Sequence, residues 1–238
     1  MAARGRTRWR TASLLLGVLL LAAALSPPVD AWADDDFRGH MAQHLLLGMY
    51  APLFLVLGAP VSLALRYSPR AVGRRIGRLL RSGPVRWLTN PVTALVLSAG
   101  GTVLVYATPL YAASTQDETL HMLVHAHFLL AGCLFAWAVA GPDPAPHRAP
   151  VMTRLVVLGV AIAVHASLAQ VMYAGFLDLP AEPSQIRGGA DLMYYGGDIG
   201  ELLLALAVLV TWRPARRLRT GREPLADDGH SPLTVNPN

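Results

Sequence analysis

The sequence contains no lysine, a single cysteine and few charged residues. Charged residues make up 15% of its 238 positions, against about 25% in a typical soluble domain. Because Cys133 is the only cysteine, the chain can form neither an internal disulfide nor a Cys-x-x-Cys metal or redox pair. It also has no long polar insert that would make a water-soluble catalytic domain, so we do not expect an enzyme.

Long apolar runs fill most of the chain, in which 53% of the residues are hydrophobic. A membrane-spanning helix needs about 20 mostly apolar residues. Six runs approach or exceed this length, at residues 12–25, 37–65, 91–110, 119–140, 151–176 and 191–212. The sequence therefore predicts an all-α fold, a polytopic transmembrane bundle of about six helices.

All 20 basic residues are arginines, and they mark one side of this predicted bundle. If successive helices cross the membrane in opposite directions, eighteen of the arginines fall on one side of it, and only Arg38 and Arg187 fall on the other. Arginine-rich loops stay in the cytoplasm, so both termini are expected there. We interpret the net charge of +5 as a topology signal, which makes the lipid bilayer, and not nucleic acid, the expected partner.

Residues 1–30 permit two interpretations, a retained first transmembrane helix or a signal segment. Ala31-Trp32-Ala33 has the small-x-small form of a cleavage site, and five helices remain if the segment is removed. We favour retention. Residues 31–215 then form the transmembrane bundle, and residues 216–238 are expected to be a disordered, basic-to-polar cytoplasmic tail.

The pattern His-Met-x-x-His occurs twice, each time where the chain enters a predicted helix, at His40–His44 and at His121–His125. Residues three and four apart share a helix face, so each copy offers two imidazoles and a thioether on about a third of the circumference. The predicted topology places both copies at the outer face of the membrane.

Ionisable residues within membrane helices are expensive to insert and are therefore functional candidates. His165 lies about 15 Å below the outer end of the fifth predicted helix. Asp191, Asp198 and Glu201 descend from the outer end of the sixth helix on a face that must look into the bundle or a wet cavity. These carboxylates would orient ligating histidines or conduct protons, and Glu201 comes out at the depth of His165.

Imidazole and thioether together suit copper best. We therefore predict a copper site formed by a subset of the outer-face histidines and methionines, with one deeper histidine as a further candidate: His40, His44, His121, His125, Met41, Met122 and His165. Two alternatives stay open. One is a b-type cytochrome in which His44 and His125 ligate haem from facing helices. The other is a transporter that moves metal ions or protons along the sixth helix.

The run from Phe37 to Pro60, FRGHMAQHLLLGMYAPLFLVLGAP, resembles the signature of the CtaG family, multi-span cytochrome c oxidase assembly factors of bacteria. The resemblance continues in HMLVH at residues 121–125 with Gly141-Pro142, in HASL at 165–168 and at 191–197, and covers about residues 37–212. It implies a multi-pass plasma-membrane protein that acts in respiratory-chain biogenesis as a metal chaperone, handling copper for haem-copper oxidase subunits. The metal-handling histidines that it implies are His40, His44, His121, His125 and His165.

Overall fold

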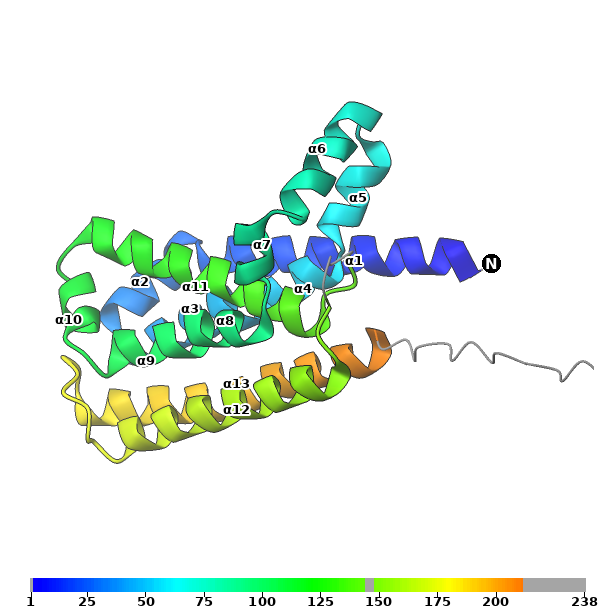
Figure 1. The fold of residues 1–238 in the computed structure, drawn as a ribbon. Coiled ribbons are helices and arrows are strands. Elements are labelled where there is room, and N and C mark those ends of the chain that lie inside the picture. The colour runs from blue at the N-terminus through cyan, green and yellow to red at the C-terminus, as the bar shows by residue number, and fades with distance from the viewer. Residues whose placement is uncertain (1, 144–147, 212–238) are drawn as a thin grey trace, which may run out of the picture.

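The computed structural model describes residues 2–143 and 148–211 (Figure 1). All the secondary structure of these residues is helical, and they contain no strand. The predicted tail at 216–238 lies outside the described residues. In chain order the helices are α1 (Ala2–Ala24), α2 (Pro27–Asp35), α3 (Phe37–Leu45), η1 (Leu46–Tyr50), α4 (Ala51–Leu57), α5 (Pro60–Tyr67), α6 (Arg70–Leu80), α7 (Gly83–Leu88), α8 (Pro91–Leu95), η2 (Val96–Gly100), α9 (Gly101–Tyr106), α10 (Leu110–Ser114), α11 (Glu118–Ala140), α12 (Val151–Tyr173) and α13 (Pro183–Thr211). The predicted all-α class is confirmed.

Four of these helical stretches are long and apolar enough to cross a membrane: Phe37–Tyr67, Glu118–Ala140, Val151–Tyr173 and Pro183–Thr211. A fifth span arises if Arg8–Ala24 and Pro27–Asp35, which meet at an angle of 51°, count as one. The third predicted run forms only a shorter apolar helix, Pro91–Tyr106. The count of six therefore stays a prediction. The last helix begins at Pro183, eight residues before the apolar run that suggested it.

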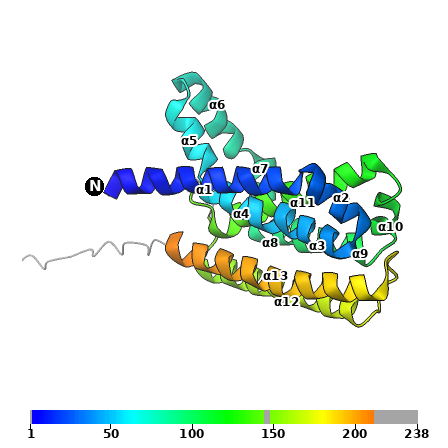
Figure 2. The ribbon, with the colours of Figure 1, turned by 180° about the vertical axis from the view of Figure 1, so that it is seen from behind.

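The long helices run along one axis, with α12 and α13 side by side (Figure 1). α1 packs along α4, and α13 also packs along α3. The start of α1, the end of α13 and the arginine-rich α6 lie toward one end of the bundle, whereas α2, α10 and the start of α11 lie toward the other (Figure 2). This separation agrees with the two sides expected from the arginines, and we refer to the second end as the outer end.

The helix that carries the first His-Met-x-x-His copy is continuous from Phe37 to Leu57 but changes its winding midway. α3 is capped by Asp36, whose carboxylate accepts a 2.8 Å hydrogen bond from the Arg38 backbone N–H. The Arg38 side chain also lowers the pKa of Asp36 by hydrogen bonding. The π-helical turn η1 comes just before Pro52, which has no N–H to donate. The helix therefore accommodates Pro52 with a widened turn and stays continuous.

α1 packs closely against α4 through small residues. A Cβ atom at Gly17 would lie 2.6 Å from the Leu55 backbone nitrogen, and one at Gly58 would lie 2.8 Å from the Leu14 Cβ. The Ser13 hydroxyl donates a 2.8 Å hydrogen bond to the Phe54 carbonyl. Small residues that allow such close backbone approach are a usual device of membrane helix pairs. α1 thus lies against α4 in this structure, and the retention of residues 1–30 stays a prediction.

Substituting Gly17 by alanine tests this packing. The added methyl group has no room against the α4 backbone, so we expect a loss of about 1–3 kcal/mol in stability, measured as a lower thermal unfolding temperature of the detergent-solubilised chain. Gly159→Ala is the matched control, because a Cβ there would meet no atom within 4 Å. An unfolding temperature for Gly17→Ala that equals that of Gly159→Ala would contradict the α1–α4 contact.

Two apolar clusters fill the interior, one toward each end of the bundle. The cluster at the outer end contains Phe37 and Tyr106, and the cluster at the other end contains Leu53 and Leu204. A cavity of about 70 Å³ lies between α3–η1, η2, α11, α12 and α13, and its lining draws on both clusters. The histidines and Glu201 singled out from the sequence lie around this cavity or between it and the outer end of the bundle.

Candidate metal-handling site

His40 and His44 lie one turn apart on α3 and are only 4% and 7% exposed. His40 Nε2 and the Tyr106 hydroxyl share a hydrogen bond of 3.0 Å. The His44 ring stands edge-on to Phe128, with 4.3 Å between ring centroids, and edge-on to Tyr106 at 5.6 Å. Both imidazoles are therefore held in fixed orientations between α3, α9 and α11.

Aromatic rings surround His40 at the outer end. Phe37 stacks on the His40 ring at 6.1 Å and Tyr111 approaches it at 4.8 Å, measured between centroids. Burial raises the pKa of Tyr111 to about 12, and the charge of Asp34 adds to this effect. The Tyr111 phenol beside His40 thus stays neutral at physiological pH.

The second His-Met-x-x-His copy lies at the start of α11, nearer the surface. The rings of His121 and His125 are 4.1 Å apart between centroids and partly exposed, and Met122 is 62% exposed. Val124, between these two histidines, packs in the same apolar cluster as Phe37, which stacks on His40. The fold therefore brings the two copies together at one end of the bundle.

The donor chemistry of this cluster suits copper, because it combines imidazole with thioether. Its geometry is more open than that of a closed metal site. Within residues 2–143 and 148–211, no three His, Cys, Asp or Glu side chains form a group that could hold a metal ion. The two copies are thus neighbouring pairs of donors and not one completed coordination shell.

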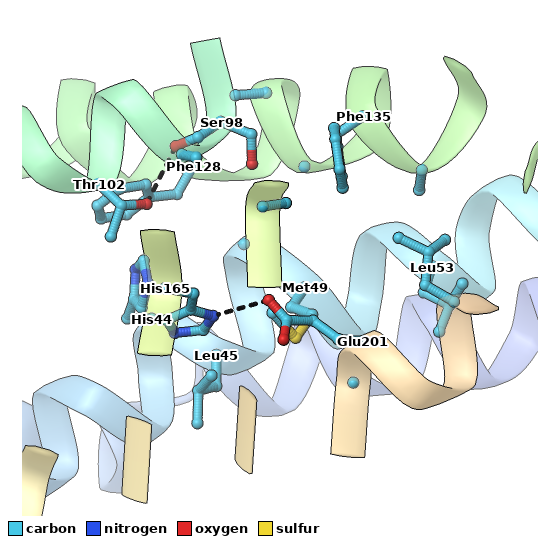
Figure 3. A pocket seen from close by; sticks show the side chains of 18 of the residues that line it. His44, Leu45, Met49, Leu53, Ser98, Thr102, Phe128, Phe135, His165 and Glu201 are labelled. Atoms are coloured by element: carbon cyan, nitrogen blue, oxygen red, sulfur yellow. Dashed lines mark hydrogen bonds and ion pairs between the residues drawn. The ribbon is translucent and has the colours of Figure 1, made fainter. Parts of the chain in front are cut away.

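The deeper histidine forms the pair expected from its depth. His165 Nδ1 lies 3.3 Å from Glu201 Oε1, joining α12 to α13 (Figure 3). The carboxylate accepts this hydrogen bond, which fixes the imidazole ring. His44, Met49, His165 and Glu201 all line the 70 Å³ cavity. Two ring nitrogens in it, His44 Nδ1 and His165 Nε2, are buried without a hydrogen-bond partner.

The polar stripe on α13 does not face the interior along its whole length. Glu201 is buried and Asp198 is partly buried, whereas Asp191 is exposed and Tyr195 is 65% exposed. The deeper part of the stripe therefore faces the interior of the bundle, whereas Asp191, near the start of the helix, does not. The stripe spans about a third of the helix circumference, so it crosses the edge of the buried face.

The structure separates Met41 from the histidine cluster. Met41 is fully buried in the outer apolar cluster, where it packs beside Gly189 of α13. His127 on α11 faces away from both copies, with Nε2 3.0 Å from the Leu97 carbonyl. Neither side chain is in a position to join the donors of His40, His121 and His125.

Three residues near the site were not singled out from the sequence. Gln43 is fully buried and donates hydrogen bonds to the Ala24 carbonyl at 2.9 Å and to Asp30 at 3.1 Å, so it ties α3 to the bend between α1 and α2. Met49 reaches the cavity from η1, and Tyr106 orients His40. Gln43 is a polar residue within an apolar run, which is a usable signal, whereas nothing local marks Met49 or Tyr106.

Comparisons with known proteins identify relatives of this chain and the family to which it belongs. The chain is 29% identical to an uncharacterized protein of Mycobacterium leprae, over 95% of this chain and 38% of that protein. Uncharacterized proteins of Mycobacterium bovis and Mycobacterium tuberculosis are each 30% identical, over 93% of this chain and 37% of theirs. The chain thus spans less than two fifths of these relatives, and no solved structure matches it. Residues 1–215 match the family described as cytochrome c oxidase caa3 assembly factor, and the chain belongs to that family.

Proposed function

We propose that this protein is a non-catalytic assembly factor that takes up copper at the outer face of the bacterial plasma membrane and passes it toward a haem-copper oxidase. The oxidase context follows from the family. One observation carries the copper step: the rings of His121 and His125 lie 4.1 Å apart at the end of the bundle where α3 carries His40.

The open arrangement of these histidines suits a metal that is cargo. A carrier must release its ion, so it needs donors that an incoming partner can replace one at a time. His121 and His125 are partly exposed and Met122 projects to the surface, whereas His40 is held inside by Tyr106. In this arrangement α11 supplies the exchangeable donors and α3 the anchored one.

Two features count against the alternative functions. Pockets that hold organic ligands usually measure about 300–1,000 Å³. The cavity beside His44 measures about 70 Å³ and is not lined by His125, so it offers no ready place for a haem held by these two histidines. On α13 the residues that follow Glu201, from Leu202 to Thr211, carry no ionisable side chain. A proton or ion path along that helix would lack polar groups in its second half.

Complementation in cells tests the proposal. In a strain that lacks this protein, we expect oxidase in the membranes to contain less copper relative to its haem, and to regain it with the wild-type chain. The variant His44→Ala, His125→Ala should accumulate in membranes without restoring the copper, whereas His127→Ala should restore it. Normal oxidase copper in the strain that carries the double variant would refute the proposed role of these histidines.

A further inference from the structure

We propose that the interior cavity is a second, buried copper station, in which His44 Nδ1, Met49 Sδ and His165 Nε2 receive a Cu(I) ion from the outer histidines. The inference rests on the proposed function, since it takes copper as the cargo. It adds a separate site about one helical turn deeper, with a thioether donor that belongs to neither His-Met-x-x-His copy.

Two unpartnered nitrogens point to a ligand in this cavity. His44 Nδ1 and His165 Nε2 are buried, line the same cavity and have no hydrogen-bond partner (Figure 3). Buried polar atoms in proteins are almost always satisfied, so each exception calls for an explanation. One ion between the two nitrogens would satisfy both.

Glu201 prepares His165 to act as a donor. The carboxylate oxygen lies 3.3 Å from Nδ1 and accepts a hydrogen bond from it, which places the proton of the neutral ring on Nδ1. The lone pair is then on Nε2, the nitrogen without a partner. Metal-binding histidines commonly carry such a carboxylate on their other nitrogen, where it fixes the tautomer and the ring orientation. Glu201 is therefore a positioning residue.

The backbone brings a thioether to the same place. Met49 lies in the π-helical turn η1, and turns of this kind are frequent at functional sites. Gly200 of α13 leaves room for Met49, because a Cβ there would overlap the sulfur and lie 2.8 Å from Cγ. Gly197, one turn away, leaves room for His165, since a Cβ there would lie 2.9 Å from Nδ1. α13 thus holds both side chains against its backbone.

This donor set favours Cu(I). Two imidazoles and a thioether form a soft set, and no further carboxylate or thiol lines the cavity, whose other walls include Leu53 and Phe135. The described His, Cys, Asp and Glu side chains include no group of three that could hold a metal ion, so a copper site here would need a donor of another kind, and the Met49 sulfur is the one that lines the cavity. His44 also follows His40 by one turn, about 6 Å along the helix, which connects the two stations.

Copper binding by the full-length chain in detergent, with Cu(I) under anaerobic conditions, tests the inference. The variant His121→Ala, His125→Ala removes the outer donors, and we expect it to keep one copper with a sulfur scatterer in its X-ray absorption spectrum. Adding Met49→Leu, a change of similar volume, should eliminate that scatterer. Adding Glu201→Gln should weaken the remaining site about 10–100-fold. Met41→Leu in the same background is the matched control and should change neither result.

The outcomes separate this inference from the proposed function. If the His121→Ala, His125→Ala variant binds no copper while the wild type does, the cavity holds water only and the inference is wrong, although the outer site stands. If that variant keeps its copper with an unchanged sulfur signal after Met49→Leu, the ion lies elsewhere and the inference is also wrong. If the wild type binds no copper at all, the proposed function fails and the inference fails with it.

Discussion

Replacing His44 and His125 together by alanine is expected to reduce copper bound by the purified protein to background. His125 is one of the partly exposed donors near the outer end, and His44 presents an unpartnered nitrogen to the cavity. The double variant therefore removes a donor from each group of histidines, and neither group keeps its full set of donors. Metal analysis after dialysis against a weak copper chelator measures the loss.

The control for this experiment is His127→Ala, which removes a histidine from the same helix as His125. The His127 side chain contacts the Leu97 carbonyl and stands apart from both groups, so its removal should leave copper binding intact. Both variants should elute from size exclusion as the wild type does, which establishes that any loss concerns donors and not folding. Stoichiometric copper on a well-folded double variant would exclude these histidines as the binding site.

Replacing Gly132 by leucine is expected to prevent a stable bundle from forming. A Cβ at Gly132 of α11 would overlap the Gly48 carbonyl oxygen and lie 2.9 Å from the Pro52 ring. The obstacle is backbone and a rigid ring, so α11 would have to move away from η1 and open the cavity between them. We expect a loss of more than about 3 kcal/mol and little monodisperse protein.

Gly159→Leu is the matched comparison, because a Cβ at this α12 position would meet nothing within 4 Å. It should be produced and should unfold as the wild type does, measured by fluorescence-detected size exclusion during heating. Gly132→Ala should fall between the two. A stable Gly132→Leu protein would show that α11 does not pack on η1 as described.

Much of the fold could be predicted because each long helix carries its own apolar run. The run that ends at Ala140 corresponds to α11, and the run that starts at Val151 corresponds to α12. The arginines also indicated which helix ends lie together. The third run predicted its helix less well. Pro91–Tyr106 is a single helix that is too short for an ordinary membrane span, and the apolar residues continue past Tyr106 although the helix ends there.

The site was only partly predictable, since helical spacing gives the face that residues share but not the direction in which that face points. The spacing on α13 placed Asp191 and Glu201 on one stripe, yet Glu201 is buried and Asp191 is exposed. Spacing likewise grouped Met41 with its histidines, although it packs in the apolar cluster. Which neighbour a face meets depends on contacts between distant segments.

Long-range contacts also explain the residues that sequence reasoning did not find. Asp143, in the connection after α11, accepts hydrogen bonds from the backbone N–H groups of Val61 at 3.0 Å and Ser62 at 2.8 Å, and so caps α5 from about 80 residues away. Met49 enters the cavity because a π-helical turn precedes Pro52 and because Gly200 leaves space on α13. Neither relationship follows from local spacing or composition.

Metal analysis combined with an optical absorption spectrum of the purified wild-type protein tests the central claim, that these histidines handle copper, most directly. We predict that the protein retains copper and shows no Soret band, because the donors are imidazole and thioether and the cavity of about 70 Å³ has no room for a porphyrin. A haem spectrum, or a protein that retains no copper after loading, would contradict the account.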